Sequence, residues 1–83
     1  MNLEGEIIEI SPIKEFSKFG KTGRVAIAII KNKEGKQKLT LWNDEIDLVK
    51  TGDKIRIING YIKEWKGEKS INIGRYGKLE VIE

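Results

Sequence analysis

The sequence predicts an all-β domain, a closed barrel of five strands with one short helix between strands 3 and 4. Apolar residues recur at every second position in several segments, and glycine or asparagine separates these segments. Residues 43–51 lose the two-residue period between two such segments, which predicts the helix. With 83 residues there is room for one modest core, so we expect a single domain over residues 1–83.

The first two strands are expected at residues 3–10 and 24–31. Along the second, the alternating sets are Val25, Ile27 and Ile29 on one side and Ala26 and Ala28 on the other. We place the larger set in the core and the two alanines on the binding face, where small side chains keep the floor of a cleft low. Tight packing of the alanines against a neighbouring strand is the equally favoured alternative. Residues 11–23 are expected to be a loop whose Phe16 caps the barrel as a core residue.

The third strand is expected at residues 37–42, after a turn at residues 32–36. Leu39 and Leu41 lie on its core face, and Lys38, Thr40 and Trp42 lie opposite. Residues 43–51 then form the short helix, which Asn43 or Asp44 caps and which buries Ile46 and Val49 before Gly52 ends it.

The fourth strand is expected at residues 54–65, with Ile55 and Ile57 facing inward. Ile62 is also expected inward, but it is at an even position whereas Ile55 and Ile57 are at odd positions. The alternation must therefore shift between them, which predicts a glycine bulge at Asn59–Gly60. A turn at Lys66–Gly67 leads into the fifth strand at residues 69–74, with Ile71 and Ile73 inward, and residues 78–83 form a short final strand or tail.

Five strands with a single short helix cannot cover both faces of an open sheet, so closure into a barrel is the economical arrangement. The OB-fold has this order of elements. An SH3-like barrel is the structural alternative, and it would not require a helix between strands 3 and 4.

The composition argues against an enzyme. The chain has no cysteine and no histidine, which removes thiolate chemistry, the commonest general base and the commonest metal ligands. The acidic residues Asp44, Glu45 and Asp47 are explained by the preference for acids at a helix start. We therefore expect no catalytic residues, metal or cofactor. The first ten residues lack a signal-peptide pattern and no stretch approaches membrane-spanning length, so we expect a soluble, cytoplasmic protein with no membrane partner.

The charge is segregated along the chain, although the net charge is only +3. Residues 14–38 hold eight bases and two acids, and residues 54–78 hold seven bases and two acids, while the three remaining segments are net acidic. Lysine-rich surfaces are common, so charge alone leaves a solvated surface and a nucleic-acid groove equally favoured.

Four short motifs follow one another at defined intervals: LTLW at 39–42, Gly52–Asp53, NGYIKEWKG at 59–67 and INIG at 71–74. Together they resemble archaeal single-stranded DNA-binding proteins and the OB-fold repeats of archaeal replication protein A, over nearly the whole chain. In that family the aromatic closing the third strand and two aromatics on the fourth stack on bases, which implies this role for Trp42, Tyr61 and Trp65. Where the family often has an acidic residue at the start of the turn, this chain has Asn32.

The residues themselves agree with the resemblance, because single-strand binding needs aromatic platforms for bases and cations for phosphates. Tyr61, Lys63 and Trp65 share one face of their strand, opposite Ile62. Arg24 is expected to meet phosphate or stack on a base, with a surface salt bridge as its alternative. The expected nucleic-acid-binding set is Trp42, Trp65, Tyr61, Arg24, Lys38, Thr40, Lys63, Phe19, Lys21, Lys66, Lys69 and Arg75.

These observations predict sequence-tolerant binding of single-stranded DNA in replication, repair or recombination, alongside other OB-fold domains or replication and repair proteins. Two alternatives remain. The same groove could dock an acidic amphipathic peptide, as an interaction module of a replication complex, or the domain could bind RNA.

Overall fold

The computed structural model describes residues 2–74 and 76–82, except for the side chain of Trp65. The elements in chain order are β1 (Leu3–Ile10), β2 (Lys14–Lys18), β3 (Lys21–Asn32), β4 (Gly35–Trp42), α1 (Asp44–Leu48), β5 (Lys54–Ile58), β6 (Tyr61–Trp65), β7 (Glu68–Asn72) and β8 (Lys78–Ile82). Among the described residues, no helix has the length and apolar character needed to cross a membrane.

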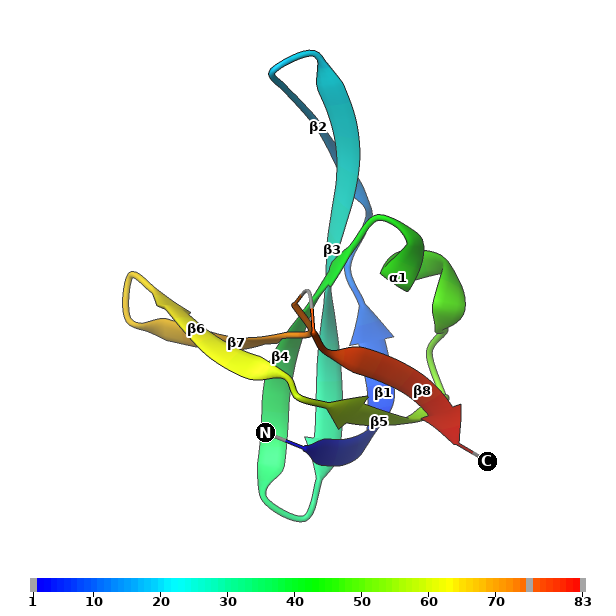
Figure 1. The fold of residues 1–83 in the computed structure, drawn as a ribbon. Helices are drawn as coiled ribbons and strands as arrows, with labels where there is room; N and C mark the ends of the chain where they lie inside the picture. The colour runs from blue at the N-terminus through cyan, green and yellow to red at the C-terminus, as the bar shows by residue number, and fades with distance from the viewer. Residues whose placement is uncertain (1, 75, 83) are drawn as a thin grey trace.

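The strands form one strongly curled sheet (Figure 1). Its order is β6-β7-β4-β3-β1-β5-β8, with β2 paired to β3 off this path. Only Asn59 and Gly60 separate β5 from β6, although these strands lie toward opposite ends of that order, so the sheet bends back on itself. This is the OB arrangement, with α1 between the β4 and β5 strands. The all-β fold and its single short helix are confirmed. The pairings form an open path from β6 to β8, so the curled sheet is a half-barrel and not the closed barrel that was predicted. The strand count exceeds five because of β2, β8 and the division of one strand into β5 and β6.

The core confirms most of the expected inward positions but reverses one strand. Its members are Ile7, Ala26, Ala28, Ile30, Leu39, Leu41, Ile46, Val49, Ile55, Ile57, Ile71 and Ile73. The facing assigned to β3 was wrong: Ala26 and Ala28 are buried, and the large set that includes Ile27 is only half-buried on the other side. Register explains the reversal, because Leu41 lies opposite Ala26 and Leu39 opposite Ala28. A narrow barrel accommodates large residues where small ones face them.

The segment predicted as one strand over residues 54–65 is broken at Asn59–Gly60. Asn59 has a φ of 56°, and a Cβ on Gly60 would lie 2.7 Å from Cγ2 of Ile57, so the chain turns sharply there instead of forming a bulge within one strand. Ile62 is 53% exposed, which contradicts its predicted core position. Ile62 points to the same side of the sheet as its partner Ile71, but this part of the β6–β7 hairpin extends beyond the barrel, so, among the described residues, no core residue covers Ile62.

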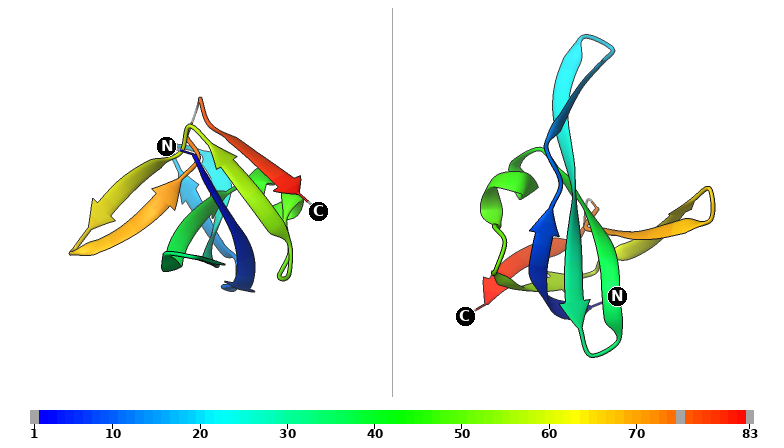
Figure 2. Two further views of the ribbon diagram at one scale, coloured as in Figure 1. Left: turned by 90° about the horizontal axis from the view of Figure 1, so that it is seen from below. Right: turned by 180° about the vertical axis from the view of Figure 1, so that it is seen from behind.

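The loop predicted over residues 11–23 is also wrong, because β2 pairs with the first half of β3. Phe19 and Gly20, with φ of 53° and 76°, form the two-residue turn of this hairpin, and both positive values fit a type I′ turn. The β6–β7 hairpin, turned at Lys66–Gly67 as predicted, projects in a different direction (Figures 1 and 2). Two hairpin arms thus extend beyond the barrel.

The helix α1 follows β4 directly and buries Ile46. Asn43 is its N-cap residue, but the Asn43 side chain makes no capping hydrogen bond. Its Oδ1 instead accepts a hydrogen bond from the Arg24 backbone N–H at 3.0 Å. Asn43 therefore joins the helix start to β3.

Candidate nucleic-acid interface

One continuous face crosses the sheet from β3 to β6. Cross-strand partners share a face, and the printed register aligns Ile27 with Thr40, Thr40 with Asn72, and Asn72 with Tyr61. Residues two positions along each strand extend the same face. We call this surface the aromatic face; its described members include Phe16, Val25, Ile27, Ile29, Lys38, Thr40, Trp42, Glu68, Ser70, Asn72, Tyr61 and Lys63.

Trp42 lies at one end of the aromatic face and is 40% exposed. Its Nε1–H donates to Oδ1 of Asn72 at 3.2 Å, and its backbone N–H donates to Oε1 of Glu45 at 2.9 Å. The ring of Phe16 meets it edge-on, with centroids 5.9 Å apart and planes at 86°. Asn72 therefore holds the nitrogen edge of the indole and Phe16 contacts the ring, while the residue stays partly open to solvent.

Tyr61 is the second exposed aromatic of this face, at 49%. A Cβ on Gly74 would lie 2.6 Å from Cε1 of Tyr61, so the phenol ring rests against the Gly74 backbone. Thr40 and Asn72, between the two aromatics in the register, are buried and form a polar floor. Two open rings thus flank a shallow polar centre.

The cations on this face differ in their surroundings. Lys63 is exposed beside Tyr61 on β6. Lys38 pairs with Glu68, Nζ to Oε2 at 3.0 Å, and both side chains are well exposed, so a phosphate would compete with a weak ion pair. On the β2–β3 hairpin, Lys21 lies opposite Lys18, and Lys18 Nζ sits 5.6 Å from the ring centroid of the nearly fully exposed Phe19. Cations therefore extend the aromatic face toward the hairpin tip.

Five predicted contacts lie away from the aromatic face, at the hairpin turn, or outside the described residues. Arg24 is turned toward α1, where its Nη2 lies 2.8 Å from Oδ2 of Asp47, so it makes the salt bridge that was its alternative. Lys69 is opposite Glu64, on the side of the hairpin away from Tyr61. Lys66 is exposed at the β6–β7 turn. Arg75 and the side chain of Trp65 lie outside the described part of the chain.

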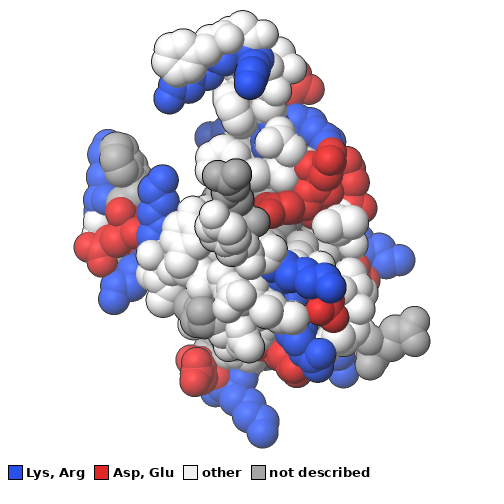
Figure 3. Space-filling model, in the orientation of Figure 1, with Lys and Arg blue, Asp and Glu red and all other residues white. Residues whose placement is uncertain are grey.

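Charges separate over the surface in the same way as along the chain. Both hairpin arms carry more basic than acidic side chains, with Glu64 and Glu68 among the lysines of the β6–β7 arm, and acidic side chains gather over α1 (Figure 3). The first turn of α1 carries Asp44, Glu45 and Asp47. The hydrogen bond and the charge of Asp47 raise the pKa of Arg24, and the same contacts lower the pKa of Asp47. Anions would therefore be drawn to the arms and repelled from the helix.

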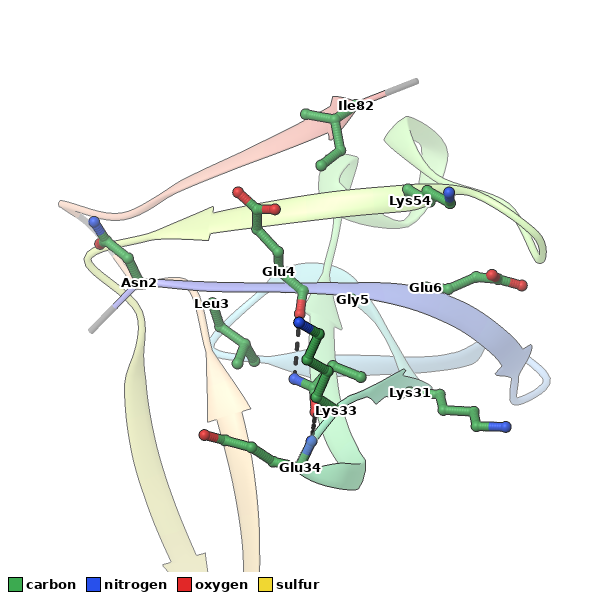
Figure 4. Close-up of a pocket in the computed structure, with 11 residues that line it drawn as sticks. Asn2, Leu3, Glu4, Gly5, Glu6, Lys31, Lys33, Glu34, Lys54 and Ile82 are labelled. Atoms are coloured by element: carbon green, nitrogen blue, oxygen red, sulfur yellow. Dashed lines mark hydrogen bonds between the residues drawn. The ribbon is translucent and has the colours of Figure 1, made fainter.

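A separate open groove of about 640 Å³ lies between the start of β1, the β3–β4 turn and β5 (Figure 4). Asn32 holds its wall by donating to the Glu4 carbonyl at 3.2 Å and accepting from the Glu34 backbone N–H at 2.9 Å. None of the predicted binding residues lines it. The described residues include no cluster of three or more His, Cys, Asp or Glu side chains suited to a metal ion.

The aromatic face contains members that the sequence analysis did not assign to it. Phe16, expected in the barrel, is 39% exposed beside Trp42 and outside the core cluster. Asn72 and the half-buried Ile27 are also new. The Phe19–Gly20 pair between alternating residues was a signal for the hairpin that places Phe16 here. The contribution of Asn72 depends on the parallel β4–β7 pairing, for which the local sequence carries no signal.

Comparisons with known proteins agree with this geometry. The family model described as single-stranded DNA binding protein Ssb-like, OB fold, matches residues 4–81. The single-stranded DNA binding protein Ssb of Saccharolobus solfataricus is 25% identical over 79 residues, covering 95% of this chain and 53% of that protein. The chain thus spans about half the length of this curated relative.

Solved structures show the same fold. The OB domain of Ta0387 from Thermoplasma acidophilum has a TM-score of 0.81 at 21% identity, covering 98% of this chain and 73% of that one. The replication factor A related protein from Methanobacterium thermoautotrophicum has a TM-score of 0.78 at 27% identity, and the match covers 98% of this chain and 78% of that one. The second OB-fold domain of replication protein A from Methanococcus maripaludis has a TM-score of 0.77 at 30% identity, and the match covers 99% of this chain and 82% of that one.

Proposed function

Because the chain belongs to the Ssb-like family of single-stranded DNA-binding OB-fold proteins, we propose that it binds single-stranded DNA across the aromatic face. That family consists of binding proteins and not enzymes. The observation that carries the proposal is the exposure of Trp42 and Tyr61 on one face beside Lys63, while the barrel core is filled without them. Large exposed aromatics grouped with cations mark a binding surface.

In the proposed complex, bases stack on Trp42 and Tyr61, each contact contributing about 1–3 kcal/mol, and Trp65 supplies a third platform. Phosphates run along Lys63, Lys38 and Lys21. Binding is sequence-tolerant because every base has a π-face, and the Asn72 amide, which could read a base edge, is buried and already bonded to Trp42. A role in replication, repair or recombination in the cytoplasm, beside other OB-fold domains, is part of this proposal.

The test compares two neighbouring residues on opposite faces of β6. Tyr61→Ala should weaken binding of an oligo-dT strand by at least about fivefold, because a stacking platform is lost. Ile62→Ala removes a similarly exposed apolar side chain from the other side and should leave the affinity unchanged. Fluorescence titration measures both, and circular dichroism checks that both variants fold.

The same titration with duplex DNA and with RNA of one sequence identifies the ligand class. Tight binding of single-stranded DNA, with weaker binding of the other two, is expected. Equal loss in both variants, or preference for RNA, would contradict the proposal.

A further inference from the structure

We propose that Phe16 and Asn72 are positioning residues that fix the Trp42 indole before DNA arrives. This inference rests on the proposed function, since it concerns how one of its stacking platforms is held. Neither residue needs to touch a base for this role. The contacts that support it come from two separate strands, β2 and β7.

Asn72 anchors the nitrogen edge of the indole. Its Oδ1 accepts the Trp42 Nε1–H at 3.2 Å, and its Nδ2 lies 3.5 Å from Oγ of Ser70. The indole N–H is only a donor, so the amide oxygen must face Trp42 and the amide nitrogen must face Ser70. Asn72 is 4% exposed, so its own side chain has little freedom to move. A bond from a fixed partner restricts rotation of the ring.

Phe16 restrains Trp42 from the β2–β3 hairpin. The two rings meet at 86°, an edge-to-face geometry favoured by aromatic quadrupoles. Gly23, the cross-strand partner of Phe16, makes this possible, because a Cβ there would clash with Cζ of Phe16. The ring occupies space that any other residue at position 23 would fill.

The contacts of Phe16 and Asn72 with Trp42 are separate from the packing of the barrel core. Phe16, Trp42 and Asn72 are all outside the hydrophobic core cluster. The main chain of Trp42 is already fixed by its pairing with Val25 and by the bond to Glu45. What Phe16 and Asn72 add is therefore control of the indole ring, which lowers the entropy that the ring loses when a base stacks on it.

The first measurement needs no DNA. In a Trp65→Phe background Trp42 is the only indole, because the chain has two tryptophans. Time-resolved fluorescence anisotropy then reports how far the Trp42 ring moves. Phe16→Leu and Asn72→Leu should each increase the amplitude of the fast decay. Phe19→Leu, the same change on the same hairpin but at the tip, should not.

Two further variants separate positioning from simple loss of bulk. Gly23→Ala should displace the Phe16 ring and increase Trp42 motion, although Phe16 itself is unchanged. Asn72→Asp keeps an oxygen acceptor for the indole N–H and should restore the small amplitude of the parent. Circular dichroism and thermal melting confirm that each variant is folded.

The second measurement is oligo-dT affinity in the same background. Phe16→Leu and Asn72→Leu should each weaken it by about threefold to tenfold, the range expected for losing one such contact. Unchanged anisotropy in both leucine variants would overturn the positioning role, whatever the affinity. If the wild-type protein bound no single-stranded DNA while the anisotropy changed as expected, the proposed function would fail and the positioning role would stand.

Discussion

Arg24 is the residue whose surroundings most clearly decide its role. Its guanidinium donates to both carboxylate oxygens of Asp47, at 2.8 and 3.3 Å, and to the Asn43 carbonyl at 3.3 Å. The hydrogen bond to Arg24, followed by its charge, lowers the pKa of Asp47. These contacts join β3 to α1, so the cation supports the fold next to the aromatic face instead of facing a phosphate.

This pair predicts a pH dependence of stability. The folded-state pKa of Asp47 lies below its ordinary value of 3.8, so the pair stabilises the folded state above that value and the contribution is lost as pH falls through the lowered pKa. Asp47→Asn should therefore lower the melting temperature near pH 7, and the difference from wild type should shrink in strong acid. Thermal melts at low salt measure it, since salt screens an exposed pair.

Asp44→Asn is the matched control for that experiment, because Asp44 is on the same helical turn while the hydrogen bonds of Arg24 go to Asp47. Near pH 7, Asp44→Asn should lower the melting temperature less than Asp47→Asn does. If the difference in melting temperature between Asp47→Asn and wild type stayed constant from neutral to acid pH, the ion pair would not contribute to the stability of the folded state.

The β2–β3 hairpin is the element that combines strain with exposure. Phe19 has a φ of 53°, a left-handed conformation that bulky residues rarely adopt, and it is 92% exposed. An asparagine followed by glycine is the preferred pair for this turn type. A strained, exposed aromatic where asparagine would fit better suggests selection for function over stability.

Phe19→Asn should therefore change stability and binding in opposite directions. Relief of the left-handed strain should stabilise the domain by up to about 1 kcal/mol, and the loss of an aromatic contact should weaken oligo-dT binding. Thermal melting and fluorescence titration on the same samples measure the two effects. Unchanged affinity would remove Phe19 from the DNA interface, and a lower melting temperature would contradict the strain argument.

Over the whole molecule, the separation of charge predicts how binding depends on salt. Both arms carry more basic than acidic side chains while acids gather over α1, so a strand that follows the arms releases counterions from its phosphates (Figure 3). The affinity for single-stranded DNA should fall as salt rises. The slope then counts the phosphates that the protein neutralises.

Lys63→Gln should reduce that slope by about 0.7 log units of affinity per log unit of salt, the value for one contact to a single strand. Lys54→Gln makes the same change in net charge at the groove of Figure 4, away from the aromatic face, and should leave the slope unchanged. Oligo-dT titrations across a salt series measure both slopes. Equal slopes for the two variants would show that net charge, and not its placement, controls binding.

The sequence by itself determined the fold class, the helix and most of the barrel core. The two-residue alternation of Leu39 with Leu41 and of Ile55 with Ile57 identifies their inward faces, and each pair is fully buried. The same alternation placed Trp42 and Tyr61 outward, and both are open to solvent. These features are local, because side-chain direction along a strand follows from its own pleat.

The tertiary structure alone decided which strands face one another, and with them the remaining site residues. The inward side of β3 depends on its pairing with β4, where the large Leu39 and Leu41 require the small Ala28 and Ala26. The neighbour of Trp42 depends on a parallel contact between β4 and β7. The contact between Trp42 and Asn72 joins residues 30 positions apart in the sequence. Pairings between strands are set by packing across the barrel and leave no periodic trace in either strand.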